Sequence, residues 1–227
     1  MTEMVNIMTN TSSQADTPTE KKGLPSYTPS ILWGLAALLL ILSIPFPYWH
    51  MTLIAPQYPD GLSLRIYVNR MDGDDDPVMD EVAEIDGLNH YIGMKSMYGA
   101  AKLERSIALP SVAVFVVLLG VAAFWRKKWA WLLTIPPMGF PFVYLLDLGL
   151  WLRYYGQNLD PNAPLSSAIK PFITPVLGVG TVGQFKTITM VGTGWFLALG
   201  ATLCIIAAVV IHFKQLGQNN ETQAATA

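Results

Sequence analysis

Four long runs of apolar residues, separated by polar segments, organise the chain after residue 27. A helix needs about 20 apolar residues to cross a bilayer, and each run is close to that length. Trp49, Trp129 and Trp151 stand near the ends of runs, where aromatic rings suit the interface between membrane and water. The pattern therefore predicts transmembrane helices over residues 28–48, 107–125, 129–152 and 191–213.

The turn between the second and third runs, residues 126–128, consists of Arg126, Lys127 and Lys128. Short loops rich in Lys and Arg stay in the cytoplasm, so this turn and both termini are predicted to be cytoplasmic. We expect a multi-pass protein of a bacterial inner (plasma) membrane. The other predicted segments are a disordered cytoplasmic tail at 1–27, extracytoplasmic loops at 49–106 and 153–190, and a cytoplasmic tail at 214–227.

The two long loops predict a folded extracytoplasmic part. In the first loop, Leu62, Leu64, Ile66 and Val68 alternate with polar or aromatic residues, which is the period of a half-buried strand. The second loop is rich in Pro and Gly and is expected to pack against the first without a fifth crossing. The predicted fold class is an all-α membrane protein: a four-transmembrane-helix bundle with a small mixed α/β extracytoplasmic cap from the two loops.

Composition supports the membrane class and excludes several functions. Charged residues make up 13% of the 227 residues, against roughly 25% in soluble domains, while hydrophobic residues make up 52%. The net charge of −2 gives no basic surface for nucleic acid. Cys204 is the single cysteine, so no intrachain disulfide or Cys-x-x-Cys site is possible. We find no Gly-rich phosphate loop and no hydrolase triad order, and we predict that the protein is not an enzyme.

A soft set of metal-ligand side chains stands in the first loop. If this segment is helical, His90, Met94 and Met97 share one face, and His50 and Met51 follow the first apolar run. Thioether ligands favour Cu(I), which leads to the hypothesis of a copper site made by these five residues. The alternative is that the methionines are packing residues and that His90 is a hydrogen-bonded structural histidine.

Asp147 lies inside the third apolar run, where a carboxylate is unfavourable unless it is paired or hydrated. Arg153, six residues further on, is its expected partner. The alternative is a role for Asp147 in a transport pathway. Pro136, Pro137 and Pro141 in the same run predict a kinked helix.

Three stretches, residues 55–62, 87–94 and 155–164, carry motifs such as Tyr58-Pro59-Asp60-Gly61-Leu62 and Leu88-Asn89-His90-Tyr91-Ile92-Gly93-Met94. They resemble a poorly characterised family of bacterial multi-pass membrane proteins associated with copper handling and nitrous oxide reductase accessory systems. The resemblance covers most of the chain after Tyr27. The family often has His where this chain has Gln157, so the second loop lacks that candidate ligand.

The resemblance and the soft ligands together suggest an inner-membrane accessory protein that assists copper delivery to, or maturation of, an extracytoplasmic copper enzyme such as nitrous oxide reductase. The expected partners are the lipid bilayer and a periplasmic copper enzyme or a membrane complex, and the expected cofactor is copper. Two alternatives stay open: a structural or scaffold subunit of a membrane permease or respiratory complex, and a small transporter that uses Asp147.

Overall fold

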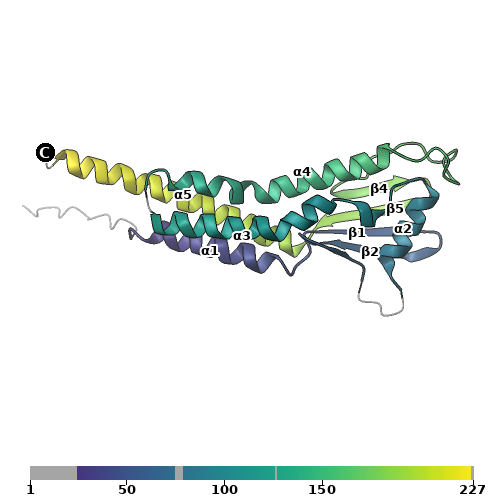
Figure 1. Ribbon diagram of the computed structural model, residues 1–227, viewed down its shortest axis with the longest axis horizontal. Coiled ribbons are helices and arrows are strands. Elements are labelled where there is room, and N and C mark those ends of the chain that lie inside the picture. The colour runs from purple at the N-terminus through teal and green to yellow at the C-terminus, as the bar shows by residue number, and fades with distance from the viewer. Residues whose placement is uncertain (1–24, 75–78, 126, 226–227) are drawn as a thin grey trace, which may run out of the picture.

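The molecule is elongated, with a bundle of long helices at one end and a β-sheet at the other (Figure 1). The computed structural model describes residues 25–74, 79–125 and 127–225, with side chains up to residue 218. The predicted tail at 1–27 therefore lies almost wholly outside the described residues. The start of the first helix, the C-terminal end of the second long helix and the end of the last helix lie on the side of the bundle opposite the sheet, and the last helix extends furthest (Figure 1).

Among the described residues, three helices are long and apolar enough to cross a membrane, spanning Lys102–Trp125, Ala130–Gln157 and Thr193–Gln218. The first corresponds to α3 (Lys102–Trp125), the second combines a 3-10 turn, η2 (Ala130–Thr134), with α4 (Ile135–Gln157), and the third is the main part of α5 (Thr193–Ala225). The length and composition of these helices indicate a membrane protein.

The prediction of a four-transmembrane-helix bundle is wrong at its first run. Helix α1 (Thr28–Ser43) has 16 residues, which at about 1.5 Å per residue is shorter than a hydrocarbon core of roughly 30 Å. Pro45 and Pro47, which lack a backbone N–H, follow at once and prevent the helix from continuing. The apolar residues after Ser43 instead lead into a strand.

The prediction of a small cap on an all-α protein is also wrong, because the fold is mixed α/β. Strands β1 (Trp49–Ala55), β2 (Tyr58–Ile66), β3 (Met71–Asp72), β4 (Gly178–Val182) and β5 (Phe185–Val191) form one sheet in the order β3-β2-β1-β5-β4. All neighbouring strands are antiparallel. The predicted strand near residues 62–68 exists as part of β2, whereas both strands of the second loop were missed.

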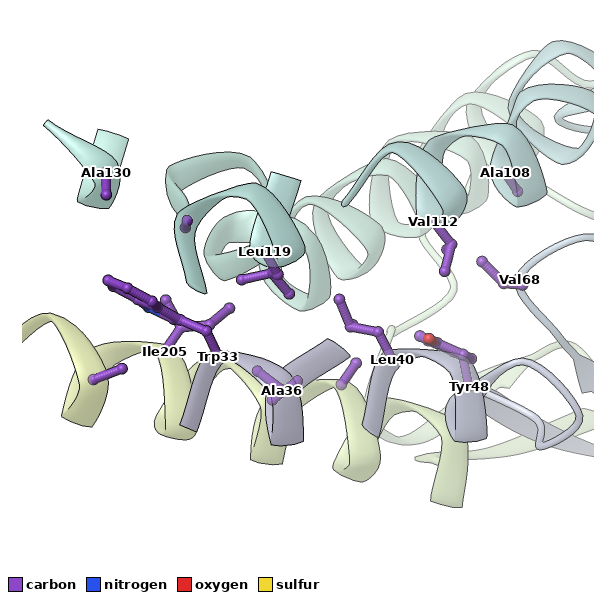
Figure 2. Packing of buried hydrophobic residues seen from close by; sticks show 14 residues of the cluster. Trp33, Ala36, Leu40, Tyr48, Val68, Ala108, Val112, Leu119, Ala130 and Ile205 are labelled. Atoms are coloured by element: carbon purple, nitrogen blue, oxygen red, sulfur yellow. The ribbon is translucent and has the colours of Figure 1, made fainter. Parts of the chain in front are cut away.

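The bundle core lies between α1, α3 and α5. Figure 2 shows Trp33, Ala36 and Leu40 of α1 pointing between Leu119 of α3 and Ile205 of α5, and all five are fully buried. The face of α5 that meets α1 carries small residues, which let two helix backbones approach closely in a membrane. These are Ala198, Ala201 and Ala208, each 0% exposed.

Helix α1 continues into β1, and β5 continues into α5, so two adjacent helices extend into two adjacent strands. The junctions cross closely: the N–H of Gly192 donates to the carbonyl of Tyr48 (2.8 Å), and that of Gly194 donates to Pro47 (2.9 Å). A Cβ on Gly192 would collide with the Pro47 carbonyl, so only glycine fits here. The sheet is thereby joined to the bundle without a flexible linker.

One face of the sheet is covered by α2 (Glu81–Tyr91) and by the end of α4 that extends past the bundle (Figure 1). Side chains of β1 and β2 on this face pack with Val82 and Ile85 of α2 and with Leu148 of α4. Because side chains alternate along a strand, the neighbours of these strand residues point to the opposite face, which no described helix covers (Figure 1).

Candidate functional site

A cavity of about 400 Å³ lies between the covered face of the sheet and the helices α2, α3 and α4. Its wall is almost entirely apolar. The sheet contributes Trp49, Met51 and Leu64, and α2 contributes Ile85 and Leu88. Further along, the cavity runs between α3 and α4, where Ser111 and Phe115 face Phe140, Val143 and Tyr144. The cavity therefore extends from the sheet and α2 to helices that are long and apolar enough to span a membrane.

Three of the five predicted metal ligands line this cavity. Met51 is buried on β1, and Met94 and Met97 are half-buried on the segment that follows α2. Met71 of β3, which sequence reasoning did not single out, lines it as well. The four methionines are brought to one space by the sheet topology and by the turn after α2.

His90 does not share a helix face with Met94 and Met97, because α2 ends at Tyr91 and Gly93 takes a left-handed conformation (φ +83°). His90 is exposed and lies beside the ring of Tyr91, with 6.4 Å between ring centroids. It is absent from the cavity wall. The structure thus places this predicted ligand away from the two methionines that follow it.

His50 is also separated from its neighbour Met51, because it points to the uncovered face of the sheet. There it lies between Arg65 of β2 and Met190 of β5 in the strand register. Burial, reinforced by the nearby Arg65 cation, lowers the pKa of His50. In the described part of the chain, no three His, Cys, Asp or Glu side chains gather as a metal-binding group.

The motifs in the two loops interlock through their backbones. The N–H of Asp160 donates to the carbonyl of Gly93 (2.8 Å), and that of Leu165 donates to Tyr91 (3.0 Å). A Cβ on Gly93 would lie 2.7 Å from the carbonyl oxygen of Asp160. These contacts give Gly93 a structural role, because a residue without Cβ permits the close approach that holds the second loop against the end of α2.

Among the described residues, three charged side chains line the largely apolar cavity: Glu104 and Arg105 of α3 and Asp147 of α4. An Arg105 guanidinium N–H donates to the carbonyl of Tyr98 (2.9 Å), while its Nε is buried without a hydrogen bond in the described residues. Among the same residues, Asp147 makes no ion pair with its expected partner Arg153.

Sequence reasoning missed Glu104 and Arg105 because they precede an uninterrupted apolar run and resemble ordinary charges at a membrane surface. Two features could have pointed to them. Both lie near the start of α3, and both line the same cavity as Asp147, the carboxylate inside the third apolar run. No family model matches this chain, and a search of characterised proteins found no matching sequence.

Proposed function

We propose that this membrane protein binds a molecule with a long apolar chain in the cavity beneath its sheet. The observation that supports this proposal is the apolar wall, which continues from buried residues of the sheet to residues of two membrane helices. Its volume of about 400 Å³ falls within the range of roughly 300–1,000 Å³ typical of small-molecule sites.

The energetics favour a chain over a compact polar ligand. Burial from water contributes about 0.8 kcal/mol per methylene group, so ten methylenes contribute roughly 8 kcal/mol before the losses from ordering are subtracted. Met51, Met71, Met94 and Met97 suit such an occupant, because unbranched thioether side chains adapt their shape to an irregular apolar ligand.

The test is binding of a fluorescent alkyl-chain probe to the purified protein. Ala100 lines the cavity on a half-buried loop position, and Ala100→Trp places an indole ring in the space. We expect this variant to bind the probe at least tenfold more weakly. Leu103→Trp is the matched control, since Leu103 is 68% exposed and does not line the cavity. Equal binding by wild type and both variants would refute the proposal.

A second candidate is Cu(I) binding within an accessory role in copper delivery to an extracytoplasmic enzyme. It is favoured by one observation: Met51, Met94 and Met97 line the same cavity. Thioethers are soft ligands that prefer Cu(I). The site proposed here is a thioether site, without His50 and His90.

Copper titration under reducing conditions distinguishes this candidate from chain binding. A Met94→Leu, Met97→Leu double variant keeps the apolar wall but removes two thioethers, and it should lose Cu(I) while retaining the alkyl probe. His90→Ala is the control and should bind Cu(I) as the wild type does. Unchanged copper uptake by the double variant contradicts the methionine site.

A further inference from the structure

The lining of the cavity is most exposed where it is formed by two helices that can span a membrane. Among the described residues that line it, Ile107 of α3 and Val143 of α4 are the most exposed, at 48% and 61%. The lining residues of the sheet and of α2, such as Met51 and Ile85, are more deeply buried. The mouth of the cavity is therefore formed by apolar side chains on helices that can span a membrane, and not on the aqueous side of the sheet.

The position of this mouth along the helix axes follows from the packing of α3 against α4. The rings of Phe115 and Phe140 meet at 5.6 Å between centroids, which fixes the level at which α3 and α4 lie side by side. Ile107 is about two turns from Phe115 toward the sheet, and Val143 is about one turn from Phe140 in the same direction. A bilayer centred near the Phe115–Phe140 contact would place the mouth in the leaflet nearest the sheet.

Each exposed residue of the mouth has a carboxylate one turn closer to the sheet. Glu104 precedes Ile107 by three residues and Asp147 follows Val143 by four, so each pair shares a helix face. Both carboxylates also line the cavity, together with the single cation Arg105. The net negative charge disfavours a phosphate or carboxylate head group that carries no compensating positive charge.

We infer that the occupant is a bilayer lipid with a zwitterionic or neutral head group, whose acyl chain passes between Ile107 and Val143 and extends beneath the sheet. This inference rests on the proposed function, and it adds the source of the ligand, its route and its head-group class. A lipid chain moves along this path from one apolar environment to another, so no apolar surface has to cross water.

The experiment uses the full protein in phosphatidylcholine vesicles that contain a small fraction of phosphatidylcholine with a diazirine near the end of one acyl chain. After irradiation, peptide mass spectrometry locates the adducts. We expect adducts on cavity residues of the extramembrane part, among them Leu88 and Met94. Adducts confined to the outward faces of α3, α4 and α5 would overturn the inference.

Val143→Trp tests the route, because an indole at the mouth obstructs passage. We expect at least a fivefold loss of adducts at Leu88 and Met94. Leu146→Trp is the matched control on the same helix, since Leu146 is 65% exposed and does not line the cavity, and its adducts should equal those of the wild type. Equal labelling of both variants and the wild type overturns the proposed route.

The head-group arm repeats the experiment with phosphatidylglycerol that carries the same diazirine chain. We expect at least threefold fewer adducts beneath the sheet than with phosphatidylcholine, and a smaller difference in a Glu104→Gln, Asp147→Asn variant. Equal labelling by the two lipids in the wild type overturns the head-group preference.

Probe binding in detergent separates this inference from the proposed function. A protein that binds the alkyl probe without lipid adducts beneath the sheet has the cavity function but takes its ligand from water. If the protein neither binds the alkyl probe nor forms lipid adducts beneath the sheet, both the proposed function and this inference fail.

Discussion

Gly93→Ala is expected to weaken the contact that holds the second loop against α2. Gly93 has a φ of +83°, and an added Cβ would lie 2.7 and 2.8 Å from the backbone oxygen and nitrogen of Asp160. A side chain in the left-handed region costs roughly 1–2 kcal/mol, and losing the hydrogen bond from Asp160 to Gly93 costs about 1 kcal/mol more. The expected loss of unfolding free energy is therefore roughly 2–3 kcal/mol.

The assay is thermal unfolding of the purified protein, followed by tryptophan fluorescence. For a chain of this size, 1 kcal/mol corresponds to about 2–4 °C, so the midpoint should fall by roughly 4–12 °C. Gly87→Ala is the control, because Gly87 lies in α2 and a Cβ added there would have no heavy atom within 4 Å. Alanine at this position should stabilise the helix by about 0.5–1 kcal/mol. Equal midpoints for the two variants would refute the reasoning.

Two further predictions concern the sheet. Trp49→Phe removes the hydrogen bond from the indole N–H to the carbonyl of Val176 (2.6 Å), and it should lower the unfolding free energy by about 1–3 kcal/mol in denaturant titration; an unchanged transition contradicts this. Burial lowers the pKa of His50, so the unfolded chain binds this proton more readily than the folded chain does. Stability should therefore fall as the pH drops through and below the ordinary histidine pKa of about 6.5, and His50→Asn should flatten that slope; a slope like that of the wild type would show that another group titrates.

The long helices could be predicted from the sequence because their signal is local. Long apolar runs predicted the positions of α3, α4 and α5. The first run misled because its apolar length includes residues after Ser43, which belong to the junction with β1 and not to a helix. Apolar content alone does not distinguish a membrane helix from a helix followed by a buried strand.

The sheet depended on partners that no local pattern reveals. Strand β5 pairs with β1, more than a hundred residues earlier in the chain, and the sequence from Phe185 to Met190 has no regular alternation of apolar and polar residues. The candidate ligands were grouped by assuming one helix through Met97. The left-handed turn at Gly93 breaks that helix, and the sheet then gathers Met51, Met94 and Met97 by tertiary packing.

The continuous path from α1 through β1, and from β5 through α5, has a mechanical consequence. The α1–β1 segment and the β5–α5 segment contact each other both in the bundle and in the sheet. They therefore resist bending at their junction, where Gly192 packs against Pro47. Helices α3 and α4 form the proposed cavity mouth, and neither is continuous with β1 or β5. If the mouth widens to admit a bulky ligand, the movement would therefore be in α3 and α4, while the α1–β1 and β5–α5 segments stay in place.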